Sequence, residues 1–361
     1  SERLDSQIRG LSQAVRNSQD AQNMIDTVEG ASAEIVTSLQ RLRELAAQSA
    51  SSTNTSTDRS FLATEAEQLI NEINRIAEET QWNGMYALDG SMDNINIQVG
   101  ANVTDTIKAS VNASNAASIG HYVIRGDAVD TAAAADAAVN GVSAGNTSIK
   151  GYIGEASFVV NANDTAKEYA SDVNEISHLT GVTAKASTNM RLSDLSAAGT
   201  MSLNIGFNGT VGTGLLSAVT VTAVVEDAND LTTLRDAIND VSSKTGVAAS
   251  FMFGRTDEIL LTDHDGDDIV LGEFDHLGTD DSTTGGTIVA QAYKFHGVSS
   301  SSSSAATTLT DGAATDSVTA RGEIELSSKQ AFVLTKTAAN FFGAGTEAKA
   351  SLESVGDIDI S

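Results

Sequence analysis

Apolar residues recur at three- and four-residue steps through the first part of the chain, a spacing that places them on one face of an α-helix. At about 1.5 Å per residue the predicted helix is about 65 to 70 Å long. A narrow apolar stripe on so long a helix predicts a partner along most of its length. The residues of this stripe are Leu4, Ile8, Leu11, Val15, Ala21, Ile25, Val28, Ile35, Leu39, Leu42 and Leu45.

A second amphipathic helix is predicted from Asp58 to about Thr80. Asp58 is the predicted N-cap, and the run of Ser, Thr and Asn before it predicts a loop that reverses the chain. The two helices are therefore expected to pack antiparallel. Asn83-Gly84 then ends the helical part, because this dipeptide favours a turn with positive φ. The apolar side of the second helix is Leu62, Leu69, Ile73 and Ile76.

Short alternating segments separated by Gly, Asn and Asp follow, beginning with "NINIQVG" at residues 94–100, and they predict strands. The alanine-rich residues 128–139 favour a short helix. The run Ser299 to Ser304 predicts an exposed loop, and "GEIELSSKQAFVLT" at residues 322–335 predicts a hairpin.

The middle of the chain contains a duplication. "NDTAKEYASDVNEISHLTGVTA", from Asn163, matches "NDLTTLRDAINDVSSKTGVAA", from Asn229. Both copies predict a strand, a helix, a Thr-Gly turn and a strand, near residues 155–206 and 219–275. The expected fold class is α+β: a long antiparallel helical rod at residues 1–105, a β-rich outer domain at 106–325, and a segment at 326–361 that returns to the rod.

The formal net charge is -27, with a pI of about 4.3. Such a chain repels a phosphate backbone at long range, which makes nucleic acid and anionic membrane surfaces poor partners. Cysteine is absent, which excludes disulfides and thiolate chemistry. No apolar run approaches the roughly 20 residues that span a bilayer, so no membrane insertion is expected.

The residue patterns of common enzymes are missing from the sequence. The five histidines are scattered without a zinc-ligand spacing, and no nucleophile elbow or phosphate-binding loop is present. The chain is therefore not expected to be an enzyme, and no cofactor is required.

A calcium site is the one metal hypothesis that the sequence raises. "TDHDGDD" at residues 262–268 offers the oxygen ligands of Asp263, Asp265, Asp267 and Asp268, which calcium prefers. The spacing departs from the helix-loop-helix calcium loop, and the corresponding turn of the other copy lacks the acids. A solvated acidic turn is the alternative interpretation.

Two arginines, Arg41 and Arg43, lie beside the leucines near the end of the first helix. Cations there complement the helix dipole, which explains one arginine better than two. An intermolecular contact explains both, because arginine is enriched at interface hot spots.

Several motifs in order resemble the N-terminal core segment of bacterial flagellin: "QIRGL", "AVRN", "LQRLRELAAQSA", "EINRIAEETQWNG" and "IQVGAN". The resemblance covers residues 1 to about 100. The two copies resemble the insertion repeats of flagellins and hook-associated proteins, and "LESVGDIDIS" resembles the passage that leads into the C-terminal helices of flagellin. The terminal helices that form the family's filament are themselves absent from this sequence.

The resemblance implies a structural subunit of the extracellular flagellar filament, which self-assembles through its helical core and exposes an acidic outer domain. It implies a subunit contact surface, also contacted by an innate immune receptor of the Toll-like family, at Gln40, Arg41, Leu45 and Glu65. The alternative hypothesis is a flagellin-like cell-surface protein whose outer domain binds a polysaccharide through a local basic patch or a bridging cation.

Overall fold

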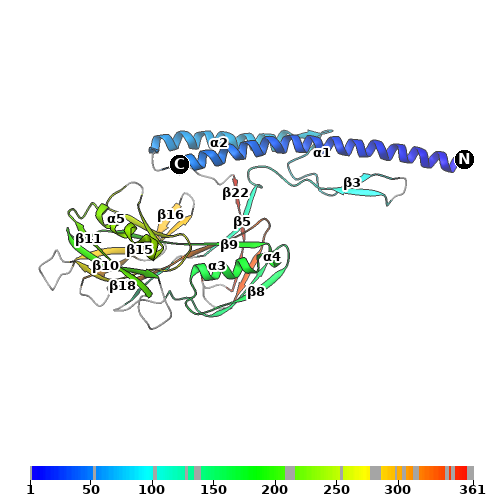
Figure 1. Ribbon diagram of the computed structural model, residues 1–361. Coiled ribbons are helices and arrows are strands. Elements are labelled where there is room, and N and C mark those ends of the chain that lie inside the picture. Colours follow the sequence, from blue (N-terminus) through cyan, green and yellow to red (C-terminus); the bar gives the residue numbers. More distant parts are fainter. Residues whose placement is uncertain are drawn as a thin grey trace. The chain divides into compact units, whose positions relative to one another are not determined.

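The computed structural model describes residues 2–51, 54–100, 104–126, 129–133, 140–207, 216–252, 255–276, 286–296, 299–302, 306–311, 317–337, 341–342 and 346–355 (Figure 1). Its helices and sheets make an α+β protein, as predicted. The chain divides into two compact units. The first is Ser1–Gly120 with Glu353–Ser361, and the second is His121–Leu352. The boundaries of these units thus differ from the predicted domain boundaries at residues 105 and 325.

Two long helices, α1 (Glu2–Ser49) and α2 (Ser56–Glu79), lie side by side in the first unit (Figure 1). The N-cap of α2 is Thr55, so the prediction of Asp58 as the cap is wrong. The Thr55 hydroxyl accepts the Asp58 backbone N–H at 3.2 Å, and the Asp58 carboxylate accepts the Thr55 backbone N–H at 3.0 Å. Asp58 is the third residue of α2. Together with Thr55 it forms a reciprocal capping box, in which each side chain satisfies a backbone donor that the helix leaves free.

The contact between the two helices buries an aliphatic core. Leu45 of α1 and Ile73 of α2 are fully buried there. Ile35 and Leu42 continue the core along α1, and Ile76 and Ala77 continue it along α2. The second half of α1 therefore has the antiparallel partner that its pattern predicted.

Two hairpins complete the first unit. Strands β1 (Gln81–Trp82) and β2 (Met85–Tyr86) pair across Asn83 and Gly84, whose φ values are 52° and 82°. Both central residues have positive φ, as the predicted Asn-Gly turn requires. Strands β3 (Ile95–Gln98) and β4 (Thr106–Ala109) form the second hairpin, and β3 contacts α1.

The second unit contains most of the strands. In its first half they are β5 (Gly120–Arg125), β6 (Val129–Ala133), β7 (Gly145–Lys150), β8 (Glu155–Val160), β9 (Val182–Ser193), β10 (Gly199–Phe207) and β11 (Leu216–Val225). In its second half they are β12 (Val247–Phe251), β13 (Ile259–Asp263), β14 (Ile269–His276), β15 (Thr287–His296), β16 (Ser299–Ser302), β17 (Thr307–Thr310), β18 (Ser317–Arg321), β19 (Glu323–Ser328), β20 (Val333–Lys336), β21 (Glu347–Lys349) and β22 (Ser351–Ser354). The helices are α3 (Ala166–Glu175), α4 (Ser177–Thr180), α5 (Thr232–Asp240) and α6 (Ser242–Thr245).

Three sheets organise these strands. One has the order β11-β10-β14-β18-β6, and another has β21-β20-β7-β8. The largest follows β12-β13-β9-β19-β5-β22, with β15 also paired to β9. The long strand β9 lies at its centre, because it pairs with β19 through its first half and with β13 and β15 through its second half.

The two largest hydrophobic cores of the described residues lie in the second unit, and β9 belongs to both. Val182 and Ala184 pack in one core, with Tyr169 of α3. Met190 and Leu192 pack in the other, with Ile238 of α5. The middle of β9 is polar and buried at Thr188 and Asn189, so a polar layer separates the two apolar cores.

Three local predictions for the outer part of the chain are wrong. The alanine-rich segment begins with strand β6, which pairs with β18, and residues 134–139 lie outside the described residues. Ser299–Ser302 forms strand β16 on β15 instead of a loop, and 303–305 are not described. Strands β19 and β20 form no hairpin, because β19 pairs with β5 and β9 while β20 pairs with β7 and β21.

Segments β8-α3-α4-β9 and β11-α5-α6-β12 have the same order of elements and share several local bonds. The Asn174 side chain donates to the Ala184 carbonyl at 3.0 Å and accepts the Ala184 N–H at 2.9 Å. Asn239 makes the matching pair of bonds with Ala249, at 2.9 and 2.8 Å. In both segments a glycine with positive φ ends the short helix, Gly181 at 74° and Gly246 at 72°.

Candidate functional site

The predicted contact residues lie on the two helices of the first unit. Gln40 and Arg41 of α1 are exposed, and Glu65 of α2 is half-buried. Leu45 is fully buried in the core between the helices. The structure therefore places three of the four residues where a partner can reach them, and it gives Leu45 a packing role within the chain.

Arg41 joins the two helices. Its Nε and Nη2 donate to Glu65 Oε1 at 2.9 and 2.8 Å, and its Nη1 donates to Glu44 Oε2 at 3.0 Å. The hydrogen bond to Glu65, followed by the one to Glu44, raises the pKa of the Arg41 guanidinium. Because the group is exposed, these pairs orient the side chains more than they stabilise the fold.

Arg43 differs from its neighbour. Its side chain is exposed and forms no ion pair within the described part of the chain. The two arginines that the sequence analysis considered together therefore have separate roles: Arg41 connects α1 to α2, and Arg43 is available to a partner.

The apolar residues of α1 form two adjacent stripes, where the sequence analysis described one. The inner stripe is buried or half-buried in the first unit: Ala14, Ala21, Met24, Val28, Ala31, Ile35, Leu42 and Leu45. The outer stripe remains exposed: Leu4, Ile8, Leu11, Val15, Ile25 and Val36. The outer stripe follows three- and four-residue steps from Leu4 to Val15 and continues at Ile25 and Val36, and the inner stripe follows steps of three, four or seven residues. One residue, about 100° of helical rotation, separates the two stripes.

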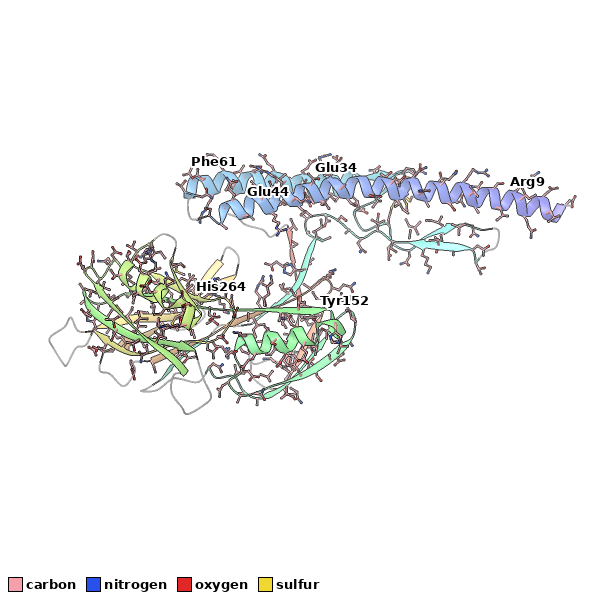
Figure 2. The ribbon with its side chains drawn as sticks, in the orientation of Figure 1. Arg9, Glu34, Glu44, Phe61, Tyr152 and His264 are labelled. Atoms are coloured by element: carbon pink, nitrogen blue, oxygen red, sulfur yellow. The ribbon has the colours of Figure 1, made fainter. Side chains whose placement is uncertain are left out.

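The outer stripe is a large apolar surface without cover in this structure. Leu11 is 53% exposed and its neighbours on the stripe are similar. Phe61 of α2, labelled in Figure 2, is 70% exposed. Exposed apolar surface on this scale marks an interaction site.

The acidic turn between β13 and β14 is organised by hydrogen bonds from its own chain. Asp263 is buried, and its Oδ1 accepts the backbone N–H groups of Asp265 and Gly266 at 2.9 and 3.0 Å. The Nζ of Lys167 donates to Asp267 at 2.7 Å and to Asp265 at 3.3 Å. The ammonium group of Lys167 thus binds the carboxylates of Asp265 and Asp267, where a metal cation would otherwise be held.

Asp268 bonds to a different part of the chain from the other three aspartates. It is buried, and its Oδ2 accepts a hydrogen bond from Asn140 Nδ2 at 2.7 Å. Burial raises its pKa to about 7, although Asn140 and the charge of Arg321 act in the opposite direction. Among the described residues no three His or acidic groups converge to hold a metal ion, so the calcium hypothesis gains no support from this geometry.

Comparison with known proteins identifies two segments of the chain. Residues 1–93 match the bacterial flagellin N-terminal helical region. Residues 202–256 match the flagellin hook IN motif. The first 93 residues are thus similar to the helical core region of bacterial flagellins.

Curated flagellins share this region at high identity. The flagellin of Halalkalibacterium halodurans is 48% identical over 108 residues, which are 30% of this chain and 40% of that protein. The flagellin of Salmonella paratyphi A is 37% identical over 185 residues, covering 47% of this chain and 37% of that protein. The chain thus spans less than half the length of these flagellins.

Solved structures of flagellar proteins are also similar. Burkholderia pseudomallei FliC has 28% identity and a TM-score of 0.28, covering 39% of this chain and 55% of that one. Hook-associated protein 3 from Legionella pneumophila has 14% identity and a TM-score of 0.31, covering 89% of this chain and 73% of that one.

Within the flagellin region, the sequence held a signal for the outer stripe and for Phe61. Phe61 precedes Leu62, so it lies off the face formed by Leu62, Leu69 and Ile73. Likewise Val15 follows Ala14, which the structure buries. An apolar residue next to a buried stripe position is the pattern of a second contact face.

None of the described helices combines the length and hydrophobicity needed to cross a membrane.

Proposed function

We propose that this protein is a structural subunit of the bacterial flagellar filament, located outside the cell, and that it self-assembles through the helices of its first unit. The match of residues 1–93 to the flagellin helical region supports this family role. The same match favours a filament subunit over the alternative of a cell-surface protein whose main function is to bind polysaccharide.

The exposed outer stripe of α1 carries the assembly proposal. An apolar seam with three- and four-residue steps packs against another helix as in a coiled coil. The inner stripe already has α2 and the β3-β4 hairpin as neighbours. The outer stripe therefore remains for helices of other subunits.

Polymerisation of the protein tests this proposal. We expect wild-type protein to form filaments, and Leu11→Ala to raise the critical concentration about 10-fold, which corresponds to about 1.4 kcal/mol. Gln13→Ala is the control, because Gln13 is exposed on the same helix turn but lies off the stripe. Sedimentation across a concentration series and electron microscopy give the readout. Equal critical concentrations for Leu11→Ala and wild type would reject the stripe as the contact.

We infer further that Gln40, Arg41 and Glu65 contribute to a surface that other subunits, and a receptor of the Toll-like family, contact. The guanidinium of Arg41 is held in place by Glu65 and Glu44, so its position is preorganised for a partner. Leu45 is left out, because its side chain is buried.

Receptor signalling tests the role of Arg41. Arg41→Ala should lower the potency of the protein about 5-fold in a reporter-cell assay, because the contact and the orientation of Glu65 are both lost. Arg75→Ala is a matched control: Arg75 also pairs with two glutamates, Glu72 and Glu79, and its side chain is 51% exposed against 47% for Arg41. Equal potencies for the two variants would contradict the assignment.

We also infer that residues 155–206 and 219–275 are two copies of one structural unit. The equivalent bonds of Asn174 and Asn239 and the equivalent glycines support this inference. Residues 202–256, which include β11, α5, α6 and β12, match the hook IN motif.

A further inference from the structure

The second unit has a shallow groove, lined mostly by apolar surface with a few polar side chains, that the helical assembly does not use. Its cavity volume is about 410 Å3. It is built where the turn between β7 and β8, helix α4, the start of β9 and the end of β19 meet (Figure 1). The residues that matter for its chemistry are Tyr152, His178, Gly181, Thr183, Ser328 and Lys329.

The groove is cationic although the chain is strongly acidic. The described residues that line it include Lys329 and the imidazoles of His121 and His178, and they include no carboxylate. Within the described part of the chain, the exposed Lys329 ammonium forms no ion pair. A chain with net charge -27 repels anions at long range, so a groove without acids is the kind of local site that an anionic ligand requires.

The orientation of His178 is fixed by a backbone contact. His178 Nδ1 lies 3.0 Å from the carbonyl oxygen of Glu175. A carbonyl oxygen only accepts, so Nδ1 carries the hydrogen and Nε2 is left for a ligand.

Tyr152 provides an aromatic surface in the same groove. Its ring lies against Gly181, where a Cβ atom would overlap the ring. Gly181 also has a φ of 74°, so this position strongly favours glycine for two reasons. Tyr152 remains 45% exposed. The electron-rich face of an aromatic ring attracts partly positive C–H groups, such as those on the face of a sugar ring.

The corresponding segment of the second copy shows that these side chains are not needed for the fold. Its backbone bonds are equivalent, yet the positions of His178 and Thr183 hold Ser243 and Ala248. The glycine equivalent to Gly181 is Gly246, where a Cβ would meet the Asp263 carboxylate at 2.9 Å instead of an aromatic ring. The imidazole, the hydroxyl group and the tyrosine are therefore features of the first copy alone.

We propose that this groove binds an acidic sugar, with one uronate ring stacked on Tyr152, its carboxylate bound by Lys329, and a sugar hydroxyl donating to His178 Nε2. The hydroxyls of Thr183 and Ser328 already bond within the chain, Thr183 to Ser327 and Ser328 to the Gly181 carbonyl at 2.9 Å. Their remaining lone pairs can accept hydrogen bonds from sugar hydroxyls. Sugar binding at this site would be a second property of a filament subunit. It can be tested separately from filament assembly.

Calorimetric titration of the whole chain with trigalacturonate at low salt and pH 6 tests the proposal. We expect a dissociation constant of about 0.1 to 1 mM. Lys329→Gln and Tyr152→Ala should each weaken binding about 5- to 10-fold. The control is Lys244→Gln, because Lys244 is an exposed lysine on the equivalent helix of the second copy, and it should bind as wild type does.

Two further titrations separate the sources of binding. Neutral maltotriose should not bind measurably, and sodium sulfate should bind more weakly than trigalacturonate. The proposal is overturned if trigalacturonate does not bind, if maltotriose binds equally well, or if Lys329→Gln has no effect. Sulfate binding as tight as that of trigalacturonate would show a simple anion site and would overturn the assignment to a sugar.

Discussion

Leu45→Ala should lower the free energy of unfolding of the first unit by about 3 kcal/mol, whereas Leu11→Ala should change it by less than about 0.5 kcal/mol. The substitution is the same and both residues lie on α1, but Leu45 is fully buried against α2 and Leu11 is 53% exposed. Removing a buried leucine loses its transfer energy and leaves a cavity, whereas an exposed leucine has little of either to lose.

Urea unfolding followed by Trp82 fluorescence measures both variants. Trp82 is the single tryptophan of the chain, and it packs beside Met24 and Val28 of α1. The signal therefore reports on the first unit. If Leu11→Ala destabilised the unit as much as Leu45→Ala does, the outer stripe would be covered within the chain, and the assembly proposal would lose its basis.

The helical part could be predicted well because its signals are local. The period of apolar residues predicted both helices, and Asn83-Gly84 predicted the turn that follows α2. The N-cap was predicted three residues late, because Asp58 is a good cap residue and Thr55 completes the box only through its bond to Asp58. Periodicity also did not separate the two stripes of α1, since residues 100° apart both fit a broad apolar face.

The β-rich part was harder to predict because its pairing is not local. The alanines of β6 have low strand propensity, but β18 offers a partner from nearly 190 residues later in the chain. The serines of β16 likewise form a strand only because β15 pairs with them. The β19 and β20 segments are adjacent in sequence, yet each forms pairs with distant strands.

The candidate sites show the same contrast. Arg41 and Glu65 could be found from motifs on two neighbouring helices. The groove of Tyr152, His178 and Lys329 could not, because four separate segments build it. The four aspartates are near one another in sequence, but Lys167 and Asn140, far away in the chain, decide what the carboxylates of Asp267 and Asp268 contact.

Asp268 lies in the polar layer between the two cores of the second unit. Its neighbours are Asn140, the charges of Arg321 and Asp267, and the backbone N–H of Gly322. Its Oδ1 has no hydrogen-bond partner. A buried carboxylate with one unpartnered oxygen favours the protonated form, because the neutral acid costs less to remove from water.

Mild acidification should therefore stabilise the second unit. The pKa of Asp268 is about 7 in the folded protein, against 3.8 as its ordinary value. Between these values the folded chain holds a proton that the unfolded chain has released, so the free energy of unfolding rises as the pH falls. From pH 7.5 to 5.5 we expect a gain of about 2 kcal/mol. Burial also raises the pKa values of Asp164, Asp172 and Asp263, which act in the same direction.

Asp268→Asn should remove most of this dependence on pH, because an amide keeps the volume of the side chain and does not titrate. Asp240→Asn makes the same charge change at an exposed position and should preserve the dependence, which separates the effect of Asp268 from the general relief of repulsion in a chain of net charge -27. Amide-exchange labelling of β14 peptides across a urea series, repeated at pH 5.5, 6.5 and 7.5, gives the stability of this unit alone. Two outcomes would contradict this prediction: a wild-type free energy of unfolding that falls from pH 7.5 to 5.5, or an Asp268→Asn variant that keeps the full wild-type dependence on pH. Either would show that Asp268 is ionised in the folded protein and that the polar layer stabilises its charge.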